Sequence, residues 1–227
     1  RRDIHHDLNA NLYAIVKLPF GFEYQMNFTP RYHWYEYMNH ESAEHPEWAG
    51  DGGRSERKNE KTFNWQVDNI LRWKKEFGED HRVEATFLQN AEKGQWWKTV
   101  AQNKLYSPSD ILGFHNIGAG TAPSVSSEDT YKTGDALMGR LFYSFKDKYM
   151  LTASVRRDGY SAFGSMNPHA VFPAVALGWV FTSEKFMEKT SDWLNYGKLR
   201  FSWGQNGNRD IGPVSYTHLR AHETAAN

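Results

Sequence analysis

The chain has 227 residues with 27 basic and 27 acidic side chains, so it lacks the basic surplus that is typical of nucleic-acid-binding proteins. Aromatic residues make up 15% of it although the mean hydropathy is −0.76, and the absence of cysteine excludes disulfides and thiolate metal sites. No apolar run approaches the roughly 20 residues that a transmembrane helix needs. A polar but aromatic-rich chain fits a membrane β-barrel, and it also fits an aromatic-rich soluble β protein.

The clearest element covers residues Phe20–Thr29. Every even position there is apolar or aromatic, and every odd position is polar or glycine. This period of two predicts a β-strand with one apolar and one polar face, because a helix would need apolar residues three and four positions apart. Similar strands are predicted, in chain order, at residues 62–73, 137–146, 149–156, 171–181 and 198–204, with weaker ones at Leu8–Lys17 and Arg82–Gln89. The prediction is thus roughly eight strands.

The lengths of these strands and of their connections favour a membrane barrel over a soluble β protein. At about 8–12 residues the strands are near the 9–11 of a tilted membrane strand and longer than most soluble strands. Short turns and long segments alternate strictly. The turns are Leu18-Pro19, Lys74–Asp80 and Asp147-Lys148, and the long segments are Trp34–Lys61, Asn90–Ala136 and Arg157–Ala170. Outer-membrane barrels alternate in this way, with short periplasmic turns and long extracellular loops. We therefore predict an all-β fold, part of an antiparallel transmembrane β-barrel.

Aromatic residues gather beside the short turns. They are Phe20, Phe22, Trp73, Phe77, Tyr143, Phe145, Tyr149, Trp179 and Phe181. Their position predicts an interfacial aromatic girdle at one rim of the barrel. The connection Thr182–Tyr196 is longer than the other turns and is predicted to hold a short helix with Ser183 as its N-cap.

Several motifs follow one another between Gly139 and Gly212. They read GRLFYSFKDKYMLTASVRRDG from Gly139, FPAVALGW from Phe172, SEKFM from Ser183 and KLRFSWGQNGNRDIG from Lys198. This stretch, roughly a third of the chain, closely resembles the barrel of SusC/RagA-type TonB-dependent transporters of Bacteroidota. Residues 1–136 agree with that family only in the alternation of strands and loops along the chain.

The resemblance implies a large barrel in the bacterial outer membrane, of which this chain is a fragment. It also implies an N-terminal plug that TonB pulls, and a SusD-like surface lipoprotein that captures oligosaccharide or peptide. We expect the plug, the TonB box and any signal sequence to precede Arg1. Residues 1–212 are the expected barrel segment, whereas residues 213–227 lack alternation and are expected to be a non-native tail.

Five side chains are candidate substrate contacts. Trp48, Trp96 and Trp97 are predicted to lie in the long loops, where exposed indoles can stack on sugar rings, pack loop against loop or contact the lipoprotein. Arg140 and Arg156 lie on polar strand faces that should line the lumen, where they could select solutes or simply be solvated. Asp68, Arg72 and Arg200 are expected on the same lumenal face.

No metal, cofactor or catalytic site is expected. The run from His40 to His45 has one residue too many for an inverted zinc-protease motif, and it lies in a predicted loop. No Ser-His-Asp, Cys-His or paired-carboxylate arrangement stands out, so the chain is not expected to be an enzyme.

The prediction is import of oligosaccharides or peptides across the outer membrane, with a SusD-like lipoprotein, TonB and membrane lipid as partners and no nucleic acid. One alternative is another outer-membrane barrel, such as a siderophore receptor or a porin. The other is a soluble carbohydrate-binding β domain.

Overall fold

The computed structural model describes residues 1–106, 111–161, 169–190 and 193–207. Nine strands of these residues form one sheet. They are β1 (Arg2–Asn9), β2 (Leu12–Lys17), β3 (Phe22–Glu41), β4 (Arg54–Phe77), β5 (His81–Lys104), β6 (Ser124–Phe145), β7 (Tyr149–Tyr160), β8 (His169–Trp179) and β9 (Leu199–Gly204). Short 3₁₀-helices occupy the connections: η1 (Pro19–Gly21), η2 (Ala49–Asp51), η3 (Gly113–Ala119), η5 (Phe181–Ser183) and η6 (Lys185–Thr190). No helix in these ranges is long and apolar enough to cross a membrane.

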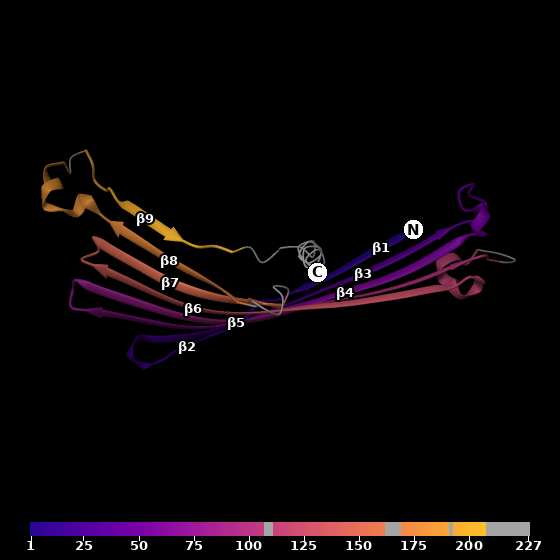
Figure 1. Cartoon of the computed structure of the whole chain (residues 1–227), viewed down its shortest axis with the longest axis horizontal. Helices are drawn as coiled ribbons and strands as arrows, with labels where there is room; N and C mark the ends of the chain where they lie inside the picture. Colours follow the sequence, from indigo (N-terminus) through magenta and orange to yellow (C-terminus); the bar gives the residue numbers. More distant parts are fainter. Residues whose placement is uncertain (107–110, 162–168, 191–192, 208–227) are drawn as a thin grey trace, which may run out of the picture. The chain divides into compact units, whose positions relative to one another are not determined.

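The strands pair with their neighbours along the chain. The order is β1-β3-β4-β5-β6-β7-β8-β9, and β2 also pairs with β3 (Figure 1). The registers of β1 with β3 and of β6 through β9 are antiparallel. Within the described ranges no pairing joins β1 to β9, so the sheet is open. The predicted fold class, a partial antiparallel barrel, is confirmed.

The strands are longer than the sequence predicts, and two predicted long loops are therefore wrong. β4 has 24 residues and begins at Arg54, and β5 has 24 residues and runs to Lys104. The connection from β3 to β4 shrinks to residues 42–53, and that from β5 to β6 shrinks to residues 105–123. The added part of β4, from Arg54 to Lys61, is polar on both faces. It therefore shows no apolar alternation, although its backbone pairs as a strand.

Two smaller predictions are also corrected. The weak strand predicted at Leu8–Lys17 is two strands, separated at Ala10, whose N–H donates to the Pro30 carbonyl at 3.1 Å. Ser183 is the last residue of η5 rather than the N-cap of a helix, since the chain turns once at η5 before η6 starts. Residues 213–227, the expected non-native tail, lie outside the described residues.

Contacts divide the chain into two compact units. Unit 1 comprises residues 1–14, 26–68 and 90–133, and unit 2 comprises residues 15–25, 69–89 and 134–227. β3, β4, β5 and β6 contribute residues to both.

In unit 2 the register of β6 to β9 builds one continuous apolar face. Three rows of four residues cross these strands. They are Phe145–Tyr149–Trp179–Leu199, Tyr143–Leu151–Leu177–Phe201 and Leu141–Ala153–Val175–Trp203. Leu177, Phe201 and Trp203 are 52%, 66% and 53% exposed. An apolar surface of this extent is unfavourable in water and is what a barrel presents to lipid, so we call this side the outward face.

The opposite face of the same strands is more polar. Arg140, Ser154, Ala174 and Gly204 form one of its rows, and Phe142, Thr152, Ala176 and Ser202 form another. We call this side the inner face. The described residues include only four buried hydrophobic side chains, Met38, Tyr106, Ala136 and Val180. A sheet with so small a core cannot be held together by hydrophobic burial in water, which again favours a membrane as its solvent.

Residues of the predicted aromatic girdle contact one another in pairs within unit 2. The centroid distances are 6.2 Å for Phe22–Trp73, 6.4 Å for Trp73–Phe77, 6.3 Å for Phe145–Tyr149 and 6.1 Å for Trp179–Phe181. At η1 the Trp73 indole donates to the main-chain oxygen of Phe20 at 3.1 Å.

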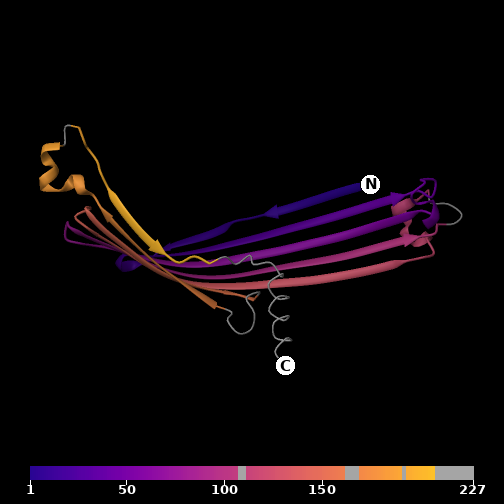
Figure 2. The same ribbon diagram turned by 45° about the horizontal axis from the view of Figure 1, so that its top comes forward.

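Unit 1 has the same two-sided character. In β4, Phe63, Trp65 and Val67 alternate with Asn64, Gln66 and Asp68. The apolar set defines the outward face of this unit, and the polar set defines its inner face. β1, indigo in Figure 2, runs beside β3 and is paired with it from Arg2↔Met38 to Asn9↔Arg31.

Candidate functional site

A chain of contacts on the inner face of unit 1 joins aromatic and charged side chains. The Trp96 indole donates to Glu60 Oε2 at 3.4 Å, and Lys58 Nζ lies 3.0 Å from Glu60 Oε1. The same ammonium group lies over the rings of Tyr35 and Tyr37, at 4.9 and 5.7 Å from their centroids. We call Tyr35, Tyr37, Lys58, Glu60 and Trp96 the inner cluster.

β1 extends the inner cluster on one side. The Tyr35 hydroxyl donates to Asp3 Oδ1 at 2.9 Å, and the His5 ring stacks on Tyr35 with centroids 4.6 Å apart. The Arg1 guanidinium lies over the Tyr37 ring at 5.4 Å. β1 and β3 thus both contribute aromatic rings with charged groups beside them. This arrangement suits ligands that carry both apolar and hydrogen-bonding groups.

Glu60 is held as a carboxylate in this cluster. Burial raises its pKa, but the hydrogen bond and charge of Lys58, with the hydrogen bond from Trp96, outweigh burial and lower that pKa below its usual 4.5. At neutral pH the carboxylate therefore accepts from Trp96 and pairs with Lys58. This fixes the indole and the ammonium group on the inner face.

Trp97 lies on the other side of the sheet, because consecutive strand residues point to opposite faces. It lines an outward pocket of about 660 Å³ together with Tyr32, Trp34, Asn59, Lys61 and Thr99. The Phe63 ring, which belongs to the apolar alternation of β4, lies 6.3 Å from the Tyr32 ring. The prediction that Trp96 and Trp97 lie together in a long loop is wrong, since both are in β5 and face opposite ways.

Trp48 and the two arginines are not part of the inner cluster. Trp48 is in the connection between β3 and β4, as predicted, with the Arg54 guanidinium 5.4 Å over its ring. Arg140, exposed on β6, is opposite Ser154, and Arg156 on β7 is opposite Met138. The two arginines are thus diagonal neighbours on the inner face of unit 2. Arg156 Nε also donates to the buried Asp158 at 2.7 Å.

Arg72, Asp68 and Arg200, which the sequence also predicts on the lumenal face, are likewise not part of the inner cluster. Arg72 Nη1 donates to Glu23 at 3.0 Å and to Gln25 at 2.7 Å, and Asp68 accepts from Asn90 at 2.6 Å. Arg200 on β9 is opposite Gly178. The inner face of each unit therefore carries charged side chains, and neighbouring polar groups hold Arg72 and Asp68.

Sequence reasoning missed Tyr35, Tyr37, Lys58 and Glu60, which all lay in the predicted loop from Trp34 to Lys61. The sequence nevertheless contains a pattern that predicts the face on which these four residues lie. Lys58 and Glu60 continue the even-numbered polar positions of β4, and Tyr35 and Tyr37 continue the odd-numbered polar positions of β3. Continuing each strand's parity beyond its last apolar residue would have placed all four on the inner face.

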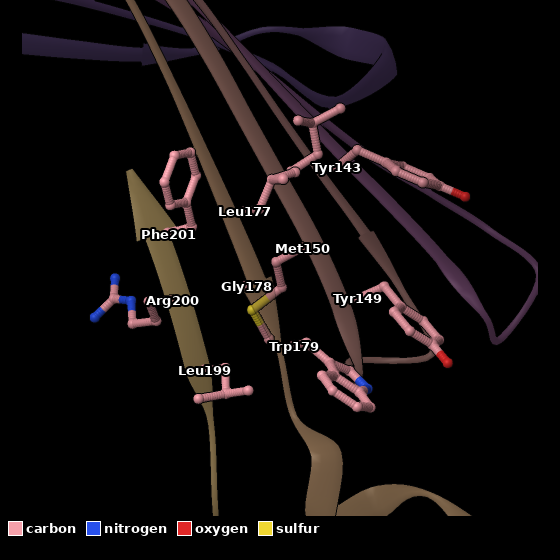
Figure 3. A pocket seen from close by; sticks show the side chains of 10 residues that line it. Tyr143, Tyr149, Met150, Leu177, Gly178, Trp179, Leu199, Arg200 and Phe201 are labelled. Atoms are coloured by element: carbon pink, nitrogen blue, oxygen red, sulfur yellow. The ribbon is translucent and has the colours of Figure 1, made fainter. Parts of the chain in front are cut away.

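The outward face of unit 2 has a different kind of hollow. It measures about 540 Å³ and is lined by residues of β6 to β9, among them Leu177, Trp179, Leu199 and Phe201 (Figure 3). Its lining is that of a lipid-contacting surface and offers few polar groups to a soluble ligand. Within the described ranges, no three His, Asp or Glu side chains are arranged to hold a metal ion.

Comparison with known proteins gives independent information about the family. Residues 2–223 match the family model described as TonB dependent receptor-like, beta-barrel. TonB-dependent receptor P26 of Formosa agariphila is 30% identical over 169 residues, which cover 73% of this chain and 17% of that protein. TonB-dependent receptor SusC of Bacteroides thetaiotaomicron is 33% identical over 124 residues, 53% of this chain and 11% of that protein.

The fold has a close counterpart among solved structures. A structure of the RagAB peptide transporter superposes with a TM-score of 0.84 at 21% identity, covering 92% of this chain and 23% of that chain. The chain thus spans less than a quarter of the length of each of these proteins.

Proposed function

The chain belongs to the family of TonB-dependent receptor β-barrels of the outer membrane, and on that premise we propose that it forms part of the wall of a SusC/RagA-type nutrient importer. Residues 1–212 are the wall segment in this proposal. The relatives matched here are named as receptors and a transporter, none as an enzyme. The alternative of a soluble carbohydrate-binding domain is wrong, because the family is one of membrane barrels.

One observation carries the proposal: each unit has an apolar outward face backed by a polar inner face. In unit 1 the inner face adds aromatic rings to its charges at the inner cluster. An impermeable structural wall would need no such groups, whereas a lumen that passes a hydrated solute needs polar contacts of moderate strength along its length.

The substrate in this proposal is an oligosaccharide or a peptide. RagAB is named as a peptide transporter, and SusC gives the family type its name. Trp96 is the proposed stacking contact, Arg140 and Arg156 are proposed charged contacts in the lumen, and Trp48 is a proposed contact near the extracellular entrance. TonB, acting through a plug, and a SusD-like lipoprotein over the entrance are the proposed partners.

The test is substrate uptake by the full-length transporter carrying single substitutions. We expect Trp96→Ala to lower uptake of the substrate at limiting concentration by up to about tenfold, since an aromatic contact contributes about 0.5–1.5 kcal/mol. Trp97→Ala is the matched control, because it removes the same ring from the opposite face of the same strand. Equal uptake by both variants, with equal amounts of folded protein, would remove the inner cluster from the path of the substrate.

The class of substrate and the partners are tested by the gene locus. An upstream plug and a neighbouring SusD-like gene are expected, and glycosidases or peptidases nearby would distinguish the two substrate classes. A complete short gene with no plug would contradict the proposed importer.

A further inference from the structure

The outward pocket of unit 1 combines features that a lipid-contacting surface does not need. Its walls include the rings of Tyr32, Trp34 and Trp97, and its polar groups come from Asn59, Lys61 and Thr99. Lys61 Nζ lies 5.4 Å from the centroid of the Trp34 ring. The Trp34 indole N–H is shielded from solvent and has no acceptor among the described residues. The wall of this pocket therefore has aromatic surface, a cation, and amide and hydroxyl groups.

The place of the pocket along its strands limits what can fill it. On β4 the outward positions Val67, Trp65 and Phe63 are apolar, and the next two, Lys61 and Asn59, are polar and line the pocket. The change from apolar to polar outward residues marks where the hydrocarbon layer ends. Because this end of β4 leads to a long connection rather than a short turn, it is the extracellular end. The pocket thus faces the headgroup layer of the outer leaflet.

The chemistry of that layer matches the pocket. A sugar ring has a face of C–H groups that packs on an aromatic ring, and its hydroxyls can pair with amide and hydroxyl groups. Phosphate and carboxylate groups on acidic sugars are attracted by a lysine ammonium group. A lipid tail would leave Asn59 and Lys61 without polar partners, so an acyl chain is a poorer fit.

We propose that this pocket binds the core saccharide of an outer-leaflet glycolipid, that is, the sugars beyond its acylated disaccharide. A sugar ring packs against Trp97 and Trp34, and an acidic substituent of the saccharide meets Lys61. The site anchors the barrel wall to its surrounding leaflet, and it is separate from the inner cluster because the sheet lies between the two.

The test uses the purified, delipidated full-length transporter and native mass spectrometry. The probes are lipopolysaccharide with its core saccharide, lipid A without the core, and free core oligosaccharide. Trp97→Ala and Lys61→Gln are expected to lower the affinity for core-bearing lipopolysaccharide about tenfold each while leaving lipid A binding unchanged. Trp96→Ala, the matched control on the inner face, should bind all three probes as the wild type does.

Heat-modifiable migration in gels verifies that each variant is folded, and Trp97→Phe, which retains a ring, should keep most of the affinity. Three results would overturn the proposal. One is equal binding of core-bearing lipopolysaccharide by all variants. Another is free core oligosaccharide binding as tightly as the glycolipid and competing with substrate uptake, which would make the pocket a substrate site. The third is a change of oligomeric state in the pocket variants, which would make it a contact between copies.

Discussion

At the scale of single residues, Glu184 links the connection after β8 to the aromatic girdle. It accepts hydrogen bonds from the Tyr149 hydroxyl and, at 3.2 Å, from the Trp179 indole, and Lys148 Nζ lies 3.8 Å away. The hydrogen bond from Tyr149, the one from Trp179 and the charge of Lys148 together lower the pKa of Glu184 below its usual 4.5. The ionised carboxylate thus orients two girdle rings at once.

This lowered pKa predicts a pH-dependent contribution to stability. A group whose pKa is lower in the folded state stabilises the fold above its unfolded value, and the contribution disappears as the pH falls through the folded value. We expect Glu184→Gln to lower the unfolding temperature of the full-length barrel at neutral pH. The difference from wild type should shrink as the pH drops below 4.5. Thermal unfolding in detergent across this range measures it, with Glu79→Gln in the turn after β4 as the control. A deficit that does not depend on pH would contradict the assigned role of the charge.

Trp96 and Trp97 show how far the candidate site could be predicted from the sequence. Adjacent tryptophans stand out in any sequence, and the inference that they contact ligand required only their residue type. Their separation onto two faces required knowing that the backbone there is a strand, and the neighbours that would reveal this are mostly polar, such as Lys93, Gln95 and Lys98. Where apolar and polar residues do not alternate, the sequence pattern does not predict the face of the sheet to which each indole points.

At the scale of elements, the turn η1 is a constrained point of the sheet. Phe20 adopts a left-handed conformation with φ of 64° and is 88% exposed, and Gly21 follows with φ of 83°. A side chain at Gly21 would collide with the main-chain oxygen of Lys74 on β4. Glycine is therefore required for the turn to pack against the neighbouring strand, which in turn presents Phe20 at the girdle.

We therefore expect Gly21→Ala to destabilise the barrel. The left-handed conformation alone costs about 1–2 kcal/mol for a residue with a Cβ atom, and the collision with Lys74 adds to it. Gly50→Ala is the control, because no atom lies within 4 Å of its added methyl group, and it should change stability by less than about 0.5 kcal/mol. The folded fraction on heat-modifiability gels at increasing urea concentration measures both. A Gly21→Ala barrel as stable as the control would show that this turn can move away from β4.

The strands themselves were predictable only where they face lipid. In β6 the sequence predicts residues 137–146, and the strand covers Ser124–Phe145. The predicted part alternates because its outward residues contact hydrocarbon. The part from Ser124 to Thr133 is polar or exposed at both parities, since water meets both of its faces. Apolar and polar residues alternate along a strand only where one face contacts lipid and the other contacts water. A strand with water on both faces shows no alternation, so its sequence does not predict it.

At the scale of the whole molecule, the alternation of connections assigns a side of the membrane to each one. The connections between β4 and β5 and between β6 and β7 are three residues each, whereas β3 to β4 and β5 to β6 are joined by 12 and 19 residues. This pattern, which the sequence predicts and the structure retains with shorter loops, assigns short turns to the periplasm and long connections to the exterior. The outward apolar rows between them then face the hydrocarbon core.

Because the chain has no cysteine, single cysteines can test this assignment at chosen positions. In full-length protein cleared of any other cysteine, Glu47→Cys should react with a membrane-impermeant maleimide on intact cells, since it is exposed in the long connection between β3 and β4. Glu79→Cys should react only after the outer membrane is permeabilised, because it lies in a short turn. Val175→Cys, in an outward apolar row, should stay unreactive until the barrel is denatured, since thiolates do not form in hydrocarbon. Reaction of Glu79→Cys on intact cells would invert the topology, and it would also move the outward pocket away from the outer leaflet.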